Sequence, residues 1–284
     1  MMSTVHRWTI GGADGQPIFG DTHVPAGPPR GTLVLCHGFK GYKDYGFFPY
    51  LADQGARSGL ITCRFNFSHS GMTLDIETFA RPDLFEQDTW DKQIFDLDQV
   101  ACAIRSSNLP GFHTGTSPEL PMTWFGHSRG GVTILLAASR PTGSPPNRVI
   151  AAAAPHSACD LDEHQRRLLH AQGWLESPSS RTGQILRMGS AWLDELEANP
   201  SAFDPLNAIG QIPHPVLLIH GSEDDSVPIG SAHQLREAGR STVRLETIEG
   251  ASHTFNAPNP MALDQASRVT EQLAHSICAF AGAN

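Results

Sequence analysis

Two hydrophobic patterns alternate along this chain. Short, almost continuous apolar runs, such as residues 32–36 and 216–220, are typical of β-strands that are buried on both faces. Longer stretches repeat apolar residues at the spacing of a helix, as Phe48, Leu51 and Ala52 do ahead of the stop signal Gly59. The alternation predicts an α/β protein with a mostly parallel sheet covered by helices on both faces.

The pattern predicts an eight-stranded sheet whose first two strands form an antiparallel start. The expected strands are residues 6–10, 18–24, 32–36, 61–65, 122–125, 149–153, 216–220 and 243–249. The expected helices are residues 47–58, 89–107, 130–139, 230–239 and 261–280.

One segment, residues 157–215, breaks this rhythm. It contains a charged run at 160–167, a Ser/Pro stretch at 177–180 and an amphipathic run at 185–196. We expect such an insertion to lie above the sheet as a cap. A chain of 284 residues suits one large domain better than two, so residues 1–284 are expected to form a single domain with a cap at about 157–215.

Composition narrows the possible classes of protein. Hydrophobic residues make up 39% of the chain and charged residues 17%, as in globular proteins, and no apolar run approaches the ~20 residues of a membrane span. The formal net charge is −9 without a dense Lys/Arg cluster, so neither nucleic acid nor a membrane is expected as a partner. The odd number of cysteines, five, and the absence of a secretion signal indicate free thiols and a cytoplasmic location.

The first candidate for chemistry is a serine on a predicted strand-to-helix turn. Residues 126–130 read Gly-His-Ser-Arg-Gly, directly after the apolar run 121–125 and directly before the helix-forming run 131–138. The two glycines allow a turn so tight that the side chain of Ser128 stands clear of the backbone, where a substrate carbonyl and a base can reach it. The pattern therefore predicts a nucleophile elbow.

A serine hydroxyl needs a base to take its proton and a carboxylate to orient that base. In a doubly wound sheet these groups follow the serine in the order acid, then histidine, each after a strand. The chain offers this order, with acidic residues in the run 221–228 after the strand 216–220, and His253 in the turn after the strand 243–249.

Four motifs in this order resemble the α/β-hydrolase family over essentially the whole chain. They are His37-Gly38-Phe39, Gly126-His127-Ser128-Arg129-Gly130, the run Gly221-x-x-Asp224-x-x-Val227-Pro228, and Gly250-Ala251-Ser252-His253. The resemblance implies the α/β-hydrolase fold and a catalytic triad of Ser128, Asp224 and His253. It also implies an oxyanion hole made by the backbone amides of Phe39 and Arg129.

Other residues compete for the acid role. Glu223 and Asp225 flank Asp224, but the family pattern places the acid three positions after the glycine of its motif, and solvated loop carboxylates are the simpler interpretation of the two neighbours. Asp160 and Asp162 follow the strand after the elbow, where some relatives keep the acid.

Several further polar residues have a structural interpretation. His37, His127 and His220 lie inside motifs and are expected to pack or to form hydrogen bonds rather than to act as bases. The side chain of Arg129 is expected to be solvated or to form a salt bridge rather than to contact substrate. The spacing of the acidic and histidine residues in the cap, Asp160, Asp162, His164 and His170, matches no compact zinc or calcium pattern, so no metal and no cofactor is expected.

The sequences of residues 37–41 and 64–67 are similar to those of dienelactone-hydrolase-like and cinnamoyl-esterase-like enzymes. This resemblance implies a serine hydrolase that cleaves small or aromatic, cinnamoyl-type carboxylic esters through an acyl-enzyme. Serine in place of cysteine leaves lactone specificity open and counts against haloalkane dehalogenation, which uses an aspartate in this fold. The candidates for an apolar substrate pocket, which also fit packing within the cap, are Trp174, Leu186, Met188 and Trp192, with Leu175, Ile185 and Leu193 beside them.

Two other functions stay open at this point. The same triad cleaves amides. The acidic residues Asp160, Asp162 and Glu163 could bind the amino terminus of a peptide substrate, as in a serine peptidase. A catalytically inactive binding protein on the same fold is the third hypothesis. The expected partner is a small-molecule ester, and a homodimer is compatible with the sequence.

Overall fold

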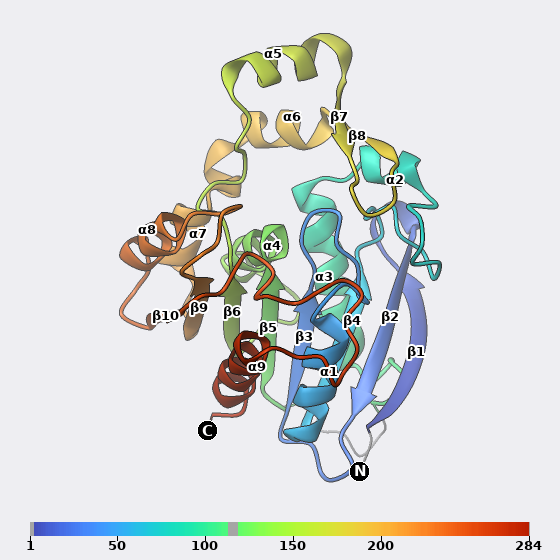
Figure 1. Cartoon of the computed structure of the whole chain (residues 1–284), viewed down its shortest axis with the longest axis vertical. Helices are drawn as coiled ribbons and strands as arrows, with labels where there is room; N and C mark the ends of the chain where they lie inside the picture. The colour runs from blue at the N-terminus through green and yellow to red at the C-terminus, as the bar shows by residue number, and fades with distance from the viewer. Residues whose placement is uncertain (1–2, 113–118, 284) are drawn as a thin grey trace.

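The computed structural model describes residues 3–112 and 119–283, and in these residues the predicted sheet is present (Figure 1). Eight strands form one sheet in the order β1-β2-β4-β3-β5-β6-β9-β10. β2 pairs antiparallel with both neighbours, and the other pairs are parallel. The strands are β1 (Thr4–Gly11), β2 (Pro17–Val24), β3 (Gly31–Cys36), β4 (Leu60–Asn66), β5 (Met122–His127), β6 (Arg148–Ala152), β9 (Val216–Gly221) and β10 (Val243–Ile248).

Alternation along the buried strands builds two cores, one on each face of the sheet. In β3, Leu33 and Leu35 belong to one core while Val34 and Cys36 belong to the other, because successive side chains of a strand point to opposite faces. Helices α1 (Phe48–Arg57) and α9 (Arg268–Ala281) cover the first face. The helices that cover the second face are α3 (Trp90–Arg105), α4 (Arg129–Ala138), α7 (Pro205–Gln211) and α8 (Gly230–Ala238).

A cap stands above the sheet, at the top of Figure 1. It consists of α5 (Glu163–Gln172), the antiparallel hairpin β7 (Trp174–Pro178) and β8 (Ile185–Gly189), and α6 (Ala191–Ala198). Leu169, Trp192 and Leu193 form a small core of its own. The short helices η1 (Ala13–Gly15), α2 (Pro82–Glu86) and η2 (Pro200–Phe203) complete the described elements, and α2 packs against β8.

Three details differ from the expected elements. The amphipathic run 185–196 is not one unit, because it divides at Ser190 into strand β8 and helix α6. α7 packs against α4 and α8, so the segment above the sheet ends before the expected boundary at 215. α9 begins at Arg268 rather than at 261, because the hydroxyl of Ser267 accepts a hydrogen bond from the Thr270 amide at 3.1 Å and caps the helix there.

The remaining predicted strands and helices agree with the structure to within a few residues, and the predicted fold class is confirmed. In the described part of the chain, no helix has both the length and the apolar content required to cross a membrane.

Candidate active site

Ser128 lies at the turn between β5 and α4, in a backbone conformation that few residues other than glycine adopt. Its φ is 54° and its ψ is −122°. The turn is so tight that a Cβ atom on Gly126 would lie 2.1 Å from the carbonyl oxygen of Gly130, and one on Gly130 would lie 2.4 Å from the carbonyl oxygen of His37. Both positions therefore require glycine, and the turn presents the serine hydroxyl at the carboxyl edge of the sheet.

The structure brings Ser128, His253 and Asp224 into one hydrogen-bonded chain. Nε2 of His253 lies 3.1 Å from Oγ of Ser128, and Nδ1 of His253 lies 2.9 Å from Oδ2 and 3.1 Å from Oδ1 of Asp224. With Nδ1–H donating to the carboxylate, Nε2 is free to accept the serine proton.

The carboxylate of Asp224 is fully enclosed and surrounded by donors. Oδ1 accepts hydrogen bonds from the amides of Ser226 at 3.0 Å and Val227 at 2.8 Å. Burial alone raises the pKa of Asp224, but the hydrogen bonds from His220, His253 and the Val227 amide outweigh burial and hold the pKa well below its ordinary value. Asp224 is therefore ionised and can stabilise a positive charge on His253.

The alternative acids do not reach His253. Glu223 and Asp225 are exposed, and Asp225 accepts a hydrogen bond from the hydroxyl of Ser226 at 3.3 Å. Asp162 caps the start of α5 by accepting from the amide of Gln165 at 2.8 Å, and Asp160 is exposed at the edge of a cavity. In the described residues the hydrogen bond to Nδ1 of His253 is made by Asp224.

The loop after β3 lies directly against the elbow. A Cβ atom on Gly38 would lie 3.1 Å from Cβ of Ser128 and 3.6 Å from the amide nitrogen of Arg129. His37 holds the loop, since its Nδ1–H donates to the carbonyl of Gly38 at 2.9 Å and its Nε2 accepts from the amide of Phe67 at 3.3 Å. Burial lowers the pKa of His37 to about 4, which is consistent with this neutral form. The loop thus brings Phe39 close to the start of α4.

His127 supports the loop that carries His253. Its Nε2–H donates to the carbonyl oxygen of His253 at 2.8 Å, and the two rings lie 4.9 Å apart. Burial, with a smaller effect of the His253 ring, lowers the pKa of His127 to about 3, so the ring is neutral. The expectation that His37, His127 and His220 form structural hydrogen bonds is confirmed.

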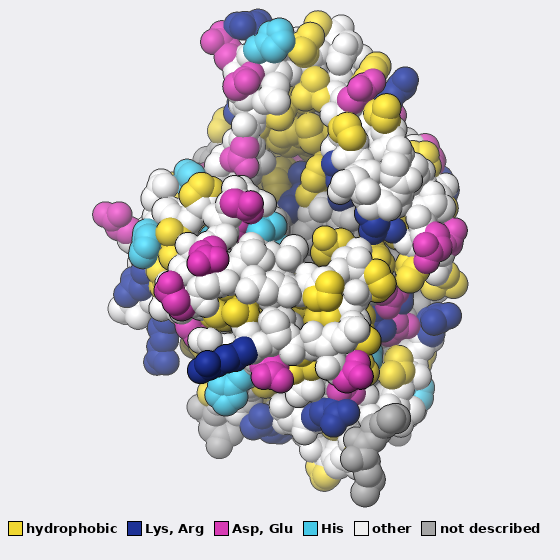
Figure 2. All heavy atoms as spheres, in the orientation of Figure 1, with side chains coloured by type: hydrophobic (Ala, Val, Ile, Leu, Met, Phe, Trp, Pro, Cys, Tyr) yellow, Lys and Arg dark blue, Asp and Glu magenta, His cyan; other side chains and the backbone are white. Residues whose placement is uncertain are grey.

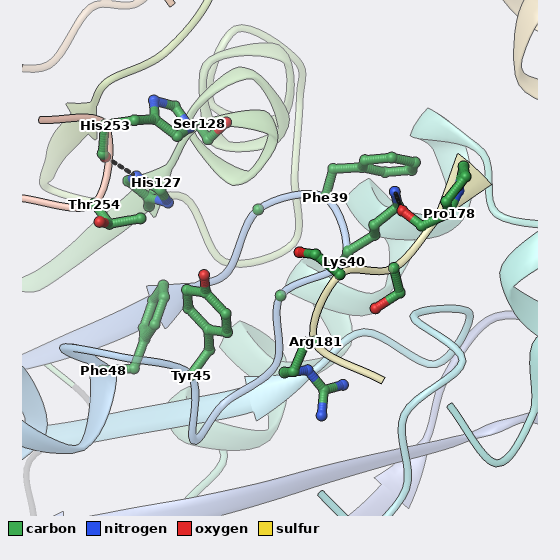
Figure 3. A pocket seen from close by; sticks show the side chains of 14 residues that line it. Phe39, Lys40, Tyr45, Phe48, His127, Ser128, Pro178, Arg181, His253 and Thr254 are labelled. Carbon is green, nitrogen blue, oxygen red and sulfur yellow. Dashed lines mark hydrogen bonds between the residues drawn. The ribbon is translucent and has the colours of Figure 1, made fainter. Parts of the chain in front are cut away.

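Two cavities meet at Ser128. The first has a volume of about 220 Å³ and lies between the loops at the carboxyl edge of the sheet and the turn of the cap hairpin. Ser128 and His253 lie on one side of it and Pro178 on the other (Figure 3). Lys40 crosses from the loop to the cap, where its Nζ donates to the carbonyl of Pro178 at 2.7 Å. In the space-filling view a hollow lies beneath the cap, with hydrophobic side chains on its walls and Lys or Arg atoms inside it (Figure 2).

The second cavity, of about 210 Å³, has the three aromatic residues Phe39, Trp90 and Trp192 in its lining, and we call it the aromatic cavity. Its lining residues include Phe39, Trp90, Ser128, Arg129, Asp160, Leu161, Met188 and Trp192. Trp90 was not among the residues expected from sequence, although its position at the start of a predicted helix, near the carboxyl edge of the sheet, is a signal that could have identified it. Arg129 does form a salt bridge, with Asp88, but its side chain also lines this cavity.

Two of the four expected pocket residues, Met188 and Trp192, line the second cavity, whereas Trp174 and Leu186 line neither cavity beside Ser128. Trp174 pairs with Gly189 across the hairpin and lies under the guanidinium of Arg187, on the opposite face of the strands from Met188. Leu186 is on the same face as Met188 but lies two residues away, where it packs in a cluster with Tyr42, Met72, Phe79 and Phe85.

In the described residues no group of three or more His, Cys, Asp or Glu side chains is arranged to hold a metal ion. Of the cap residues considered for this role, His170 lies 3.1 Å from Glu197 and 3.7 Å from Asp194 on α6.

Comparisons with known proteins agree with this architecture. The profile of the alpha/beta hydrolase family matches residues 33–268. Monoglyceride lipase from Mus musculus is 26% identical, and the match covers 93% of this chain and 86% of the lipase.

Solved structures of low sequence identity share the fold. Est1E from Butyrivibrio proteoclasticus, with ferulic acid bound, superposes with a TM-score of 0.69 at 16% identity, over 96% of this chain and 97% of Est1E. Dienelactone hydrolase from Anabaena variabilis superposes with a TM-score of 0.61 at 16% identity, over 98% and 96% of the two chains.

Proposed function

The chain belongs to the alpha/beta hydrolase family, and from this premise we propose that it hydrolyses carboxylic esters through an acyl-enzyme formed on Ser128. The observation that carries the proposal is the continuous hydrogen-bonded chain from Ser128 through His253 to Asp224, with the serine at the junction of two cavities. An ester has two parts, and two cavities beside one nucleophile suit such a substrate.

In the first half of the reaction, Nε2 of His253 takes the proton of the Ser128 hydroxyl as the serine oxygen attacks the ester carbonyl carbon. The ionised Asp224 stabilises the imidazolium that forms. Collapse of the tetrahedral intermediate breaks the bond to the alcohol oxygen, which receives the proton from His253. The acyl group remains on Ser128.

The negative charge on the carbonyl oxygen requires fixed donors. The amides of Phe39 and Arg129 fit this role, because Gly38 brings the loop after β3 against the first residue of α4. Each such donor contributes about 3 kcal/mol to the stability of the transition state. A water molecule, deprotonated by His253, then attacks the acyl-enzyme and releases the acid.

The walls of the second cavity favour aromatic groups. Phe39 is 40% exposed and offers a flat apolar surface to a ring, Met188 adds an adaptable one, and the buried Trp90 and Trp192 complete the wall. Similarity to Est1E, whose structure holds ferulic acid, and to monoglyceride lipase supports ester hydrolysis over other reactions of the fold. The proposed substrates are small or aromatic carboxylic esters.

Peptide hydrolysis has less support. Of the acidic residues considered for binding an amino terminus, Asp162 caps α5 and Glu163 pairs with Arg167 at 2.5 Å, which leaves Asp160 alone at the cavity.

The test is a panel of nitrophenyl esters, hydroxycinnamate methyl esters and aminoacyl anilides. Ester hydrolysis should fall by up to ~10⁶ in Ser128→Ala, and mass spectrometry should detect the acyl group on Ser128 in the wild type. Ser201→Ala, which changes an exposed serine of η2, should keep full activity. Ester hydrolysis at the wild-type rate in Ser128→Ala would contradict the proposal, and a preference for the anilides would assign the protein to amide hydrolysis.

A further inference from the structure

The guanidinium of Arg129 belongs to a residue that lines the aromatic cavity, and it forms no hydrogen bond to any described residue. In the described part of the chain it forms one ion pair, between Nη2 and Oδ2 of Asp88, which is long at 3.4 Å. The group is held by rings instead, with Cζ 4.1 Å from the ring centroid of Trp90, 5.8 Å from Phe39 and 6.0 Å from Trp192. A guanidinium has five N–H donors, and native proteins rarely leave such donors unused when they are buried.

Three nitrogen donors of residues that line the aromatic cavity lack a hydrogen-bond partner. Besides Nε of Arg129, the indole nitrogens of Trp90 and Trp192 are enclosed without a hydrogen-bond partner in the described part of the chain. The side chain of Arg129 is 13% exposed, and the residue lines the cavity. Among the enclosed acceptors of the described residues, Oδ1 of Asp88 also lacks a partner, but Asp88 does not line the cavity. A ligand that supplies an oxygen acceptor could form hydrogen bonds with the exposed part of the Arg129 guanidinium.

The charge of Arg129 is already balanced. Asp88 and Glu195 are the carboxylates that act on it electrostatically, and Asp160 adds a further acidic side chain at the cavity wall. The negative charges of these residues would therefore repel a carboxylate ligand. A neutral oxygen would accept hydrogen bonds from the guanidinium without this repulsion.

We propose that Arg129 is a specificity-determining residue, which binds a neutral oxygen, such as a carbonyl, ether or hydroxyl oxygen, at the far end of the substrate group in the aromatic cavity. The inference deepens the proposed ester hydrolysis and rests on it. The same residue supplies the backbone amide proposed for the oxyanion hole. Arg129 would therefore bind the reacting carbonyl with its backbone and the distal oxygen with its side chain, which sets the distance between the two groups. Substrates with an oxygen at the matching distance are held in the reactive position.

The test uses ester pairs that differ by one oxygen. Esters with a 4-acetylphenyl group are compared with nearly isosteric 4-isopropylphenyl esters, with the ring separated from the ester by two saturated carbons so that the substituent does not alter the reactivity of the ester. One series carries the ring on the acyl side and the other on the alcohol side. In one of the two series, kcat/KM of the wild type should favour the acetyl compound by about tenfold, as expected for a hydrogen bond to a charged donor.

The decisive variant is Arg129→Met combined with Asp88→Asn, which removes both charges and leaves no unpaired buried carboxylate. Its acetyl-to-isopropyl ratio should fall to about one, and thermal unfolding checks that it is folded. Arg140→Met with Asp91→Asn is the matched control, because Arg140 pairs with Asp91 at 2.6 Å and lies over Phe203 away from both cavities. The control should keep the wild-type ratio.

Three results would overturn the inference: no preference in either series, a preference that persists in the Arg129→Met variant, or a higher kcat/KM for the corresponding 4-carboxyphenyl esters. Calorimetric dissociation constants of the same esters for Ser128→Ala give a second measurement that does not depend on turnover. Absence of ester hydrolysis by the wild type counts against the proposed function, whereas hydrolysis without the oxygen preference counts against the role of Arg129.

Discussion

Nε2 of His220 lies 3.3 Å from Oδ2 of Asp224, the same oxygen that lies 2.9 Å from Nδ1 of His253. His220 also donates from Nε2 to the carbonyl oxygen of Val227 at 2.8 Å, which bridges the two ends of the loop that carries the acid. His220 is almost fully buried, and it stabilises the charged form of Asp224.

We therefore predict that His220 positions Asp224. His220→Leu should lower kcat by about tenfold with little change in KM, because it removes one donor to the carboxylate and releases the Val227 carbonyl. His220→Gln, which keeps an N–H donor, should recover most of the loss. Equal losses in both variants, with unchanged stability, would mean that the N–H group has no role.

The assignment of the acid can be tested with its neighbours. Asp224→Asn should lower kcat by about 10⁴, because an amide favours the wrong tautomer of His253 and does not stabilise its charged form. Glu223→Gln and Asp225→Asn make the same chemical change on exposed side chains of the same loop and should retain wild-type activity. A large loss in either neighbour, with Asp224→Asn active, would reassign the acid.

Gly38 should be intolerant of a side chain. In Gly38→Ala the new Cβ would lie 3.0 Å from the carbonyl oxygen of His127 and 3.1 Å from Cβ of Ser128, which pushes the Phe39 amide away from the elbow. We expect kcat to fall by about 10² if this amide is an oxyanion donor. Gly230→Ala, at a position with open space around it, is the control and should be fully active. Wild-type kcat in Gly38→Ala would argue against the proposed oxyanion hole.

The buried neutral His37 should make stability depend on pH. Its pKa is about 4 in the folded protein and 6.5 when it is unperturbed, so only the unfolded state takes up a proton between these values. Stability from this group is complete above pH 6.5 and is lost as the pH falls, by about 2 kcal/mol between pH 7.5 and pH 5. Urea unfolding at the two pH values should show that His37→Asn loses about 2 kcal/mol less than the wild type.

The wild type has to be compared with His37→Asn because buried carboxylates change the free energy of unfolding with pH in the opposite direction to His37. Burial raises the pKa of Asp88 and of Asp96 to about 6, so their contribution to the free energy of unfolding rises as the pH falls. These groups are common to both proteins and cancel in the difference. An identical pH dependence for wild type and His37→Asn would contradict the prediction.

Substitutions of two residues of β8 should have different effects, one on the stability of the protein and the other on its activity toward aromatic esters. Leu186→Ala should cost about 3 kcal/mol of unfolding free energy, because Leu186 is almost completely buried among Tyr42, Phe79 and Phe85. Met188→Ala should change kcat/KM for aromatic esters severalfold with a smaller loss of stability, since Met188 is partly exposed at the second cavity. Denaturant unfolding and ester kinetics on both variants measure the two effects, and a reversed pattern would place the substrate elsewhere.

Much of the fold was predictable because its signals are local. A strand buried on both faces must be apolar along its whole length, and this is why β3, β5 and β9 were recognised from sequence. Ser128 and the acidic run 221–228 follow the buried strands β5 and β9, whose carboxyl ends meet at one edge of the sheet. The choice of Asp224 within that run, and of His253 after the partly exposed β10, rested on the resemblance to the α/β-hydrolase family. The structure places the three together, while their catalytic roles remain proposals.

The cap was less predictable because its signals depend on what it packs against. The apolar positions of residues 185–196 are compatible with one amphipathic element, yet pairing with β7 makes the first part a strand. Periodicity also could not tell Met188, at the cavity, from Leu186, in the cluster below the cap, because both lie on the same face of the strand.

By itself, then, the sequence determined the sheet, the helices that cover it and the position of the serine turn, because alternation, helical spacing and glycine act through neighbours along the chain. Only the tertiary structure decided which aromatic rings surround the side chain of Arg129 beside that turn. Trp90 of α3 and Trp192 of α6 lie beside Arg129. Aromatic rings, rather than hydrogen-bond acceptors, therefore replace water around the guanidinium. That environment depends on packing between distant segments, which no local pattern encodes.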